Sequence, residues 1–131
     1  MNSVTNLTLH GGGRFEELGN YARLRRVGDF IVVAGTTAVE PSGQLHAPGD
    51  TYAQTRYVLA RMGDLLVEAG GSLGDVIRTR AFLADMTQVR GFVRAHGEAF
   101  AGIEPVCTAV GAVLTVPGMM VEIEVDAIAR R

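Results

Sequence analysis

The feature that most constrains the fold of this chain is a strict alternation of apolar and acidic residues close to its C-terminal end. In the stretch VEIEVDA, apolar side chains fill every second position, and the carboxylates of Glu122, Glu124 and Asp126 fill the positions between them. Because successive side chains of a strand point to opposite faces, this pattern predicts a strand, Met119 to Ile128, with one apolar and one acidic face. Such a strand belongs in a sheet that is covered on one side and polar on the other.

A second strand is predicted immediately upstream, from Pro105 to Val113. Between the two strands lies the stretch LTVPG, whose Pro117–Gly118 dipeptide is a strong turn signal. We therefore expect the two segments to form a hairpin or a close strand pair. The only cysteine, Cys107, lies in the first of them, so a thiol and three carboxylates occur in the same part of the chain.

Further strands and two helices are predicted in the rest of the chain. The strands are short runs rich in β-branched or alternating apolar residues, at Val4–Leu9, Ala22–Arg26, Phe30–Ala34 and Val76–Leu83. The helices show apolar residues at spacings of three and four, at Thr51–Ala69 and Thr87–Phe100. The order helix, strand, helix, strand implies a crossover that lays both helices on one face of a sheet of about six strands.

The faces of two of these elements can be assigned. In the strand before the second helix, Ile77 is expected on the apolar face, and Arg78 and Arg80 are expected on the charged face. On the second helix, Val93 and His96 share the apolar stripe. If the helices cover the apolar side of the sheet, both arginines share the outer face with the three carboxylates. That face is either a solvated surface with cross-strand ion pairs or an oligomer interface or cleft floor, and the sequence leaves both open.

Length and charge exclude several classes of protein. With 131 residues and 47% apolar residues, the chain is expected to form a single domain, residues 1–131, with a substantial core. A formal net charge of −2 and 6% aromatic residues offer neither the basic surface nor the stacking platform typical of nucleic-acid binding. With one cysteine, no signal-peptide pattern and no apolar run of about 18 residues, we expect a cytoplasmic protein that does not bind membranes.

The residues by themselves do not identify a reaction. His10, His46 and His96 lie far apart and have no metal-ligand spacing to another histidine, cysteine or acid, so no metal and no cofactor is expected. Cys107 lies inside a predicted strand, where a cysteine is usually a small hydrophobe, and no adjacent base is visible in the sequence. His96 is either a buried or interfacial histidine or a proton-transfer group, because the pKa of histidine lies near working pH.

The order of several motifs resembles that of one known family. The motifs are Tyr21 followed by VGDFIVVAGTTA, then EAGGSLGDVIRTRAFLADM, the EAF that ends at Phe100, and VEIEVDAIA. Between Tyr21 and Ala129 they resemble the RidA/YjgF family of small enamine/imine deaminases, also labelled L-PSP endoribonucleases. The resemblance implies an α+β, chorismate-mutase-like fold with a six-stranded mixed sheet and two helices on one face. It also implies a homotrimer with a ligand cleft between each pair of subunits.

The resemblance further implies a reaction and the residues that perform it. RidA-type enzymes hydrolyse 2-aminoacrylate and related enamines, through their imine tautomers, to 2-keto acids and ammonia. Tyr21 matches the tyrosine of the family's cleft, and Gly35 matches the glycine that follows its second strand. Glu122 matches the glutamate that positions the attacking water. These three residues are therefore the expected ligand-binding and catalytic groups.

Cys107 departs from the family pattern. It stands where a Pro-x-Arg segment of the family carries the arginine that grips the substrate carboxylate. A charge-assisted hydrogen bond contributes roughly 1.5 to 3 kcal/mol, so its absence is expected to weaken carboxylate recognition on the order of ten- to a hundredfold. One hypothesis is that Arg94, at a helix position where RidA places a cleft asparagine, supplies the cation instead. The alternative is that Arg94 is an ordinary surface arginine.

Three functions therefore remain in view. The first is a hydrolytic deaminase of small enamines or imines, with aminomuconate-like compounds as well as 2-aminoacrylate among its candidate substrates. The second is a trimer that binds a small carboxylate or aromatic metabolite without catalysis. The third, an endoribonuclease that inhibits translation, is disfavoured by the acidic balance of the chain and its few aromatic residues.

Overall fold

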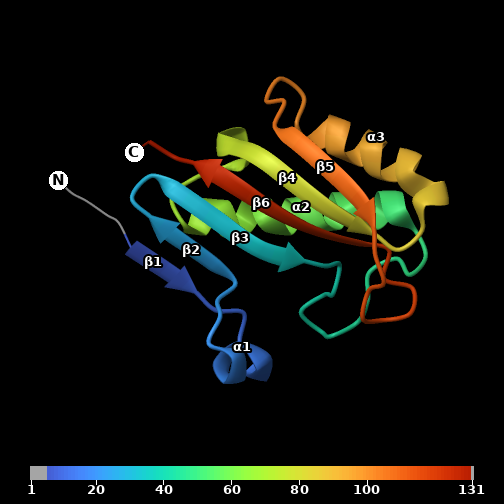
Figure 1. Cartoon of the computed structure of the whole chain (residues 1–131), viewed down its shortest axis with the longest axis horizontal. Coiled ribbons are helices and arrows are strands. Elements are labelled where there is room, and N and C mark those ends of the chain that lie inside the picture. Colours follow the sequence, from blue (N-terminus) through green and yellow to red (C-terminus); the bar gives the residue numbers. More distant parts are fainter. Residues whose placement is uncertain (1–5, 131) are drawn as a thin grey trace.

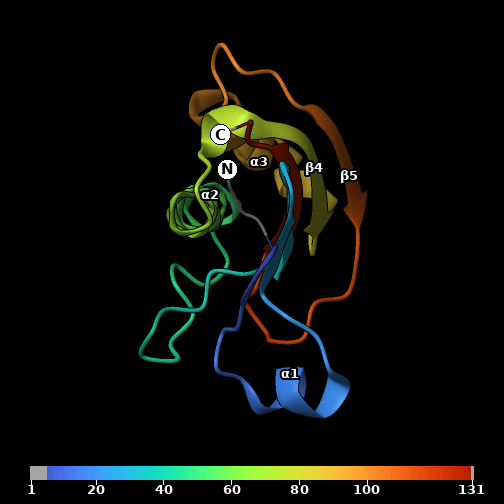
Figure 2. The same cartoon turned by 90° about the vertical axis from the view of Figure 1, so that its left-hand side faces the viewer.

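Six strands form a single mixed sheet, and two long helices cover one of its faces (Figure 1, Figure 2). This computed structural model describes residues 6–130 of the chain. The strands are β1 (Asn6–Leu9), β2 (Leu24–Val27), β3 (Phe30–Thr36), β4 (Val76–Leu83), β5 (Val106–Gly111) and β6 (Val121–Ile128). The helices are α1 (Arg14–Gly19), α2 (Thr51–Glu68) and α3 (Val89–Ala99), with short 3₁₀ turns η1 (Leu73–Asp75) and η2 (Met86–Gln88).

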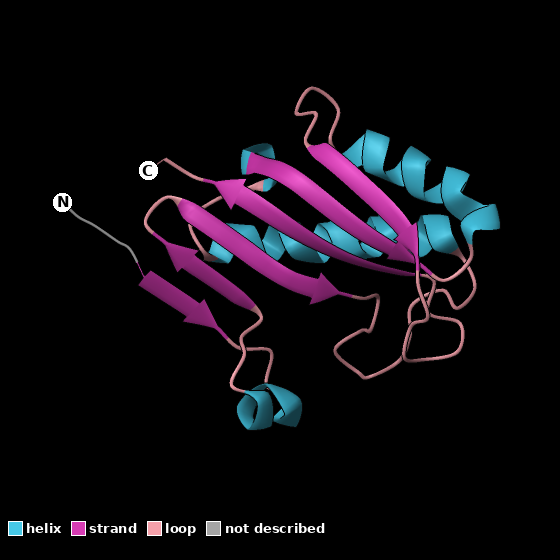
Figure 3. Cartoon of the chain, viewed as in Figure 1, coloured by secondary structure: helices cyan, strands magenta, loops and turns pink. Residues whose placement is uncertain are grey.

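The strands lie in the order β1-β2-β3-β6-β4-β5, and neighbours are antiparallel except for β4 and β5, which are parallel. The predicted α+β fold, a six-stranded mixed sheet with two helices on one face, is confirmed (Figure 3). Of the first predicted strand, Val4–Leu9, residues 6–9 form the edge strand β1, and residues 4 and 5 lie outside the described part of the chain. The short helix α1 was not expected from the sequence and lies beyond one end of the sheet (Figure 2).

The predicted hairpin of β5 and β6 is wrong, because β4 lies between these two strands. Thr79 of β4 is aligned with Cys107 of β5 on one side and with Val125 of β6 on the other. A crossover through α3 pairs β5 with one edge of β4, and β6 takes the other edge. The Pro117–Gly118 dipeptide does form a turn. That turn is only part of the longer connection 112–120, which carries the chain from the edge of the sheet into its interior.

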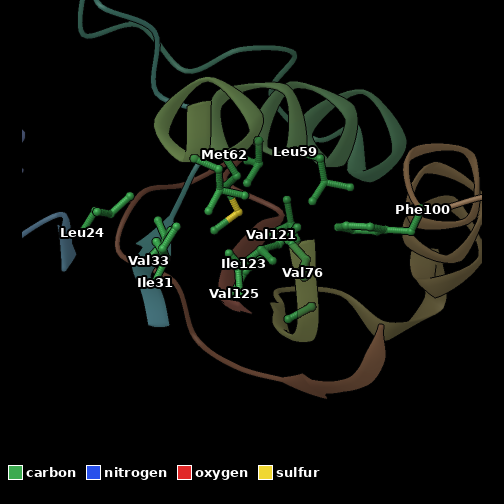
Figure 4. Packing of buried hydrophobic residues seen from close by; sticks show 14 of the residues in the cluster. Leu24, Ile31, Val33, Leu59, Met62, Val76, Phe100, Val121, Ile123 and Val125 are labelled. Atoms are coloured by element: carbon green, nitrogen blue, oxygen red, sulfur yellow. The ribbon is translucent and has the colours of Figure 1, made fainter. Parts of the chain in front are cut away.

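The core lies between the sheet and the two long helices (Figure 4). Apolar residues of β6 and of α2 meet there and are almost completely inaccessible to solvent, as the two periodic patterns predicted. Burying a side chain of this size contributes about 1.5 to 3 kcal/mol, so this layer is a main source of stability. Its members include Val121, Ile123, Val125 and Ala127 of β6 and Val58, Leu59, Met62 and Leu66 of α2.

The long helix α2 has a defined beginning and end. Asp50 precedes its first residue, and one carboxylate oxygen of Asp50 accepts the Ala53 N–H over 3.0 Å. This bond satisfies a backbone donor that has no partner within the helix. After the helix, Gly70 has a φ of +86°, a left-handed conformation that ends helices and that favours glycine.

Arg26 is a buried cation that ties three segments together. Its guanidinium donates to the carbonyls of Gly28 and Ala69 over 2.8 Å and to the carbonyl of Ala129 over 2.9 Å. Ala69 ends α2, and a cation is favourable at the C-terminal end of a helix. Arg26 thus links the β2–β3 turn, the end of α2 and the end of β6.

The face of the sheet opposite the helices is polar, as predicted. One guanidinium nitrogen of Arg80 lies 3.3 Å from Glu124 and 3.4 Å from Asp126, and Arg78 lies 3.8 Å from Asp126. These are partly exposed pairs, and such pairs contribute at most about 1 kcal/mol each. They hold the side chains of neighbouring strands in a ladder of alternating charge.

Two residues that were expected on apolar faces are exposed. Ile77 is 44% exposed because the register of β4 against β6 shifts between Val76 and Arg78, which turns its side chain outward. Val93 of α3 is 60% exposed. Ala95, and not Val93, is buried on the apolar side of this helix. Along residues 6–130 no helix is both long and apolar enough to cross a bilayer.

Candidate functional site

Glu122 and Gly35 meet where β3 ends beside β6. β3 is aligned with β6 at Val33 and Val125 and again at Thr36 and Ile123, so two residues of β3 oppose one residue of β6 between these points. This irregularity is a β-bulge, a feature that re-aims side chains beside functional sites. The structure therefore brings together two of the residues that the sequence predicted for the site.

The Glu122 carboxylate occupies the space that a side chain at position 35 would need. A Cβ built on Gly35 would lie 2.5 Å from Oε2 and 2.9 Å from Cδ of Glu122. Contacts this short do not occur in folded proteins, so any larger residue at position 35 displaces the carboxylate. Glycine at position 35 therefore leaves room for the Glu122 carboxylate in its present position, and the atoms that a larger residue would displace all belong to the Glu122 side chain.

Tyr21, the third predicted residue, follows α1 and is held by it. The Tyr21 N–H donates to the Glu16 carbonyl over 3.0 Å, and the ring lies where a side chain at Gly19 would be. The side chain is exposed at the rim of a cavity of about 500 Å³, which Thr8 and Arg25 also line. Tyr21 is thus placed on the surface with one side of its ring fixed.

Arg23 and Glu16 connect the Tyr21 segment to Gly35, and sequence reasoning missed both. One guanidinium nitrogen of Arg23 donates to the Gly35 carbonyl over 2.8 Å and to the Thr36 hydroxyl over 3.3 Å. Another lies 4.0 Å from Glu16, which is only 7% exposed. The Glu16 carboxylate also accepts the Gly11 N–H, at 2.9 and 3.1 Å to its two oxygens.

These contacts form a continuous series of polar interactions from the loop before α1 to the end of β3. The series runs from Gly11 through Glu16 and Arg23 to the carbonyl of Gly35. A buried charge that keeps its partners holds a local geometry firmly, because losing one partner leaves the other uncompensated. This arrangement holds the backbone of Gly35, against which the Glu122 carboxylate lies.

Cys107 lies apart from Glu122 within one chain. Residues aligned across a sheet point to the same side, and Cys107 is aligned with the inward-facing Thr79. Glu122 is aligned with Phe82, on the outer side. The exposed thiol and the carboxylate therefore project from opposite faces of the sheet.

Arg94 is on the helix side of the sheet and already has partners. Its guanidinium lies 3.8 Å from the centre of the Tyr52 ring, and its Nε lies 3.6 Å from Glu98. The Tyr52 hydroxyl donates to Glu98 over 2.6 Å, and this bond, helped by Arg94, lowers the pKa of the Glu98 carboxyl below its usual value. The three side chains form one cluster between α2 and α3.

His96 is enclosed between α3 and the sheet. Its Nε2 lies 2.9 Å from the Thr79 hydroxyl, and its ring lies 5.4 Å from that of Phe92 and 4.6 Å from that of Phe100. Partial burial lowers the pKa of His96 below the ordinary histidine value. In one chain His96 is thus half-buried, and its ring has one polar partner.

Metal ligands do not converge in the part of the chain that is described. Within residues 6–130, no three side chains of histidine, cysteine, aspartate or glutamate form a group that could hold a metal ion. The groups with chemical capacity at the Gly35 end of β3 are the carboxylate of Glu122 and the guanidinium of Arg23, whereas Tyr21 lines a cavity whose lining includes neither Gly35 nor Glu122. This set suits proton transfer and the binding of a polar small molecule.

The sequence of this chain matches a known family along most of its length. Residues 12–129 match the family model described as Endoribonuclease L-PSP. An uncharacterised protein of Streptomyces coelicolor is 36% identical over 124 residues, which are 91% of this chain and 89% of that protein. A RutC family protein of Pyrococcus abyssi is 30% identical over 107 residues, which are 82% of this chain and 84% of that protein.

Solved structures show the same relationship. A member of the YjgF/YER057c/UK114 family from Mycobacterium tuberculosis is 37% identical and superposes with a TM-score of 0.83, covering 95% of this chain and all of that one. A Rid family protein from Yersinia pestis is 26% identical and superposes with a TM-score of 0.77, covering 85% of this chain and 89% of that one.

Proposed function

Because this chain belongs to the YjgF/Rid family, whose family model is described as Endoribonuclease L-PSP, we propose that it hydrolyses the C=N bond of small reactive imines. An enamine substrate first becomes its imine tautomer. Water then adds to the imine carbon, the C–N bond breaks, and ammonia leaves a carbonyl product behind. No redox step is involved, so the reaction needs only a polarised substrate, an oriented water and a group that moves protons.

The observation that carries this proposal is the position of the Glu122 carboxylate over Gly35. A carboxylate placed there orients a water molecule, accepts its proton as the water attacks, and returns the proton to the departing nitrogen. Positioned proton transfer of this kind contributes roughly 10² to 10⁴ in rate. The Arg23 clamp on the Gly35 carbonyl keeps the backbone beneath the carboxylate in place.

The reaction takes place in a cleft between copies of the chain, in a homotrimer. Within one chain, Glu122 and Cys107 face opposite sides of the sheet, so one copy alone does not bring them together. The outer face of the sheet also carries exposed apolar side chains beside its ion pairs, with Val32 at 42% exposure and Phe30 and Val110 also exposed. A second copy packed on this face covers these side chains and supplies the other wall of the cleft.

Substrates with a carboxylate are bound less tightly than in arginine-containing relatives, because Cys107 offers no positive charge. In the assembled cleft, Arg94 supplies the missing cation from the helix side, and Arg23 supplies a second guanidinium beside Gly35. Arg94→Ala then raises KM for an anionic imine about tenfold or more. An unchanged KM in this variant shows that the cation has not been relocated to the helix.

The experiment that tests the proposed reaction measures ammonia release from freshly generated imines. Glu122→Gln removes the charge at nearly constant shape and is expected to lower kcat about a hundredfold to ten-thousandfold. The matched control is Glu124→Gln, which alters the same face of the same strand two positions away and is expected to keep kcat close to that of the unmodified protein. If the unmodified protein and Glu122→Gln both release ammonia no faster than the imine does without protein, the proposal is contradicted for the imines used.

A second candidate function, ligand binding without catalysis, is favoured by one observation. Position 107 is a cysteine, and by the resemblance to the family it stands where relatives carry the carboxylate-binding arginine. A cleft that retains Glu122 but binds substrate weakly suits a sensor of small metabolites better than an efficient enzyme. Saturable binding of a small carboxylate without any ammonia release supports this alternative. Turnover that depends on Glu122 excludes it.

A further inference from the structure

A hollow on the solvent side of α2 has the form of a ligand site and lies away from Glu122. It has a volume of about 340 Å³ and is lined by His46, Tyr52, Ala53, Arg56 and Tyr57. Pockets for small ligands commonly begin at about 300 Å³ and combine aromatic walls with a few polar groups. On α2, Tyr52 lies one helical turn before Arg56, and Ala53 lies one turn before Tyr57. A single helix therefore supplies most of the lining of the hollow.

One wall of the hollow is a preformed aromatic stack. The rings of His46 and Tyr57 lie 4.5 Å apart, at an angle of 20° between their planes. His46 is itself held by a 2.9 Å contact from its Nδ1 to Glu40 and by its backbone N–H, which donates to the Ala38 carbonyl over 2.8 Å. A wall that is ordered before binding lowers the entropic cost of binding a flat ring against it.

A further lining residue, Tyr52, is held just as firmly. Its hydroxyl donates to Glu98 over 2.6 Å, and the Arg94 guanidinium stacks 3.8 Å from the centre of its ring. Ala53, which has a small side chain, also lines the hollow. Fixed aromatic rings in the lining favour a planar guest, because stacked and edge-to-face aromatic contacts are worth about 0.5 to 1.5 kcal/mol beyond area burial.

Arg56 is the charged residue of the lining, and it lies close enough to Glu98 to help lower the pKa of that carboxyl. Among residues 6–130 no carboxylate lies within 4.0 Å of its guanidinium, whose recorded contact is with the Tyr52 ring at 5.8 Å. The two acids near the hollow are engaged elsewhere: Glu40 contacts His46, and Glu98 contacts Tyr52 and Arg94. The guanidinium is thus available for an anion, and its fork suits a carboxylate in two-point contact.

We propose that this hollow binds small planar aromatic carboxylates, with the ring between Tyr52 and the His46–Tyr57 stack and the carboxylate on Arg56. The site lies on the opposite side of the sheet from Glu122, because α2 covers one face of the sheet and Glu122 lies on the other. The two proposals share one residue, Arg94, which stacks on the Tyr52 ring here. The loop that carries His46 follows directly from the end of β3, so the two sites are connected through the backbone after Gly35.

The test is a titration of the isotope-labelled protein with benzoate, followed by the backbone amide signals of Ala53 and Tyr57. Benzyl alcohol serves as a neutral ring of the same size, and acetate serves as a carboxylate without a ring. Saturable shifts with benzoate, and much weaker effects of the other two, are expected. Binding of benzyl alcohol as tight as that of benzoate overturns the proposed role of the carboxylate, and binding of acetate as tight as that of benzoate overturns the role of the ring.

Variants identify the residue that supplies the charge. Arg56→Gln is expected to weaken benzoate binding about tenfold to a hundredfold, and Arg90→Gln, which removes an exposed arginine of α3 outside the hollow, is expected to leave it unchanged. Glu122→Gln is expected to bind benzoate normally, so failure of the proposed reaction and failure of this site are distinguishable. Equal affinity of Arg56→Gln and Arg90→Gln overturns the proposal, as does the absence of saturable shifts up to about 50 mM, well above a millimolar Kd.

Discussion

At position 35 the absence of a side chain decides where the Glu122 carboxylate lies. Gly35→Ala places a methyl group in the space that the carboxylate occupies, so we expect it to move Glu122 and to lower imine hydrolysis about a hundredfold or more. The free energy of unfolding is expected to change much less than the rate, because the displaced group lies on the outer face of the sheet. Initial rates of ammonia release and urea denaturation of the same variant check both expectations.

The outcome for Gly35→Ala separates a positioning role from a general loss of structure. A variant with full activity contradicts the importance of the contact between Gly35 and Glu122. A variant that loses activity and stability in proportion indicates that the bulge, and not the carboxylate, was disturbed.

His96 makes the stability of the fold depend on pH in a defined direction. Burial lowers its pKa in the folded protein below the value of about 6.5 expected in the unfolded chain. As the pH falls through about 6.5, the unfolded chain takes up a proton that the folded protein resists, so the free energy of unfolding falls. Above that pH, histidine is neutral in both states and this dependence disappears.

The pH dependence is measured by urea denaturation at a fixed protein concentration between about pH 5.5 and pH 7.5. His96→Asn is expected to show a flatter dependence than the unmodified protein, and His10→Asn, which alters an exposed histidine, is expected to retain the original slope. Parallel slopes for the unmodified protein and His96→Asn contradict the assignment.

At the residue scale, the sequence supplied the acid and the glycine of the candidate site but not the residues that hold them. Glu122 and Gly35 were identified by their match to a family pattern, and the structure places them in contact. Glu16 and Arg23 carry no local signature, because a buried glutamate paired with an arginine can be recognised only when the loop before α1 is folded.

At the element scale, replacing either of two glycines of α3 by alanine is expected to change the free energy of unfolding, in opposite directions. Nothing lies within 4 Å of a Cβ built on Gly97, so Gly97→Ala is expected to raise the free energy of unfolding by about 0.5 to 1 kcal/mol. A Cβ on Gly91 would lie 3.2 Å from the backbone nitrogen of Tyr52, so Gly91→Ala is expected to separate α3 from α2 and to lower stability by roughly 1 to 3 kcal/mol. Chemical denaturation of the two variants provides the comparison.

Each glycine variant serves as the control for the other, because both remove a glycine from the same helix. Stabilisation of both variants indicates that helix propensity dominates and that the contact between α2 and α3 adapts. A lower free energy of unfolding for Gly97→Ala contradicts the inference that a side chain at position 97 has open space.

Strands and helices were predictable from local pattern, and strand pairing was not. The bounds of β4 and most of those of α2 and α3 follow from periodicity and capping, which act over a few residues. Pairing depends on contacts between distant segments, so a turn signal at Pro117–Gly118 suggested a hairpin although β4 separates β5 from β6. The exposure of Ile77 has the same origin, because a shift of register between strands leaves no trace in the alternation of one strand.

At the scale of the whole molecule, the proposed trimer assembles through the outer face of the sheet. The proposed trimer is expected to have a mass three times the 13.9 kDa of one chain. Val32→Glu introduces a charge at the centre of this face, beside Asp126, and is expected to shift the protein towards single chains. Val67→Glu is the matched control, because Val67 is exposed on α2, on the other side of the molecule.

Light scattering coupled to size-exclusion chromatography measures both variants. Loss of the trimer in Val32→Glu alone agrees with assembly through the sheet. A single-chain mass for the unmodified protein contradicts the trimer, and dissociation of Val67→Glu alone places the contact on the helices instead.

The strand order has a consequence for synthesis on the ribosome. Of the six strands described within residues 6–130, β6 is made last, and it is an interior strand that joins β1, β2 and β3 to β4 and β5. Until residues 121–128 leave the exit tunnel, β3 and β4 each present an unpaired edge, and such edges invite pairing with other chains. A message truncated shortly before this strand therefore yields two half-sheets that need chaperones, not a smaller working protein.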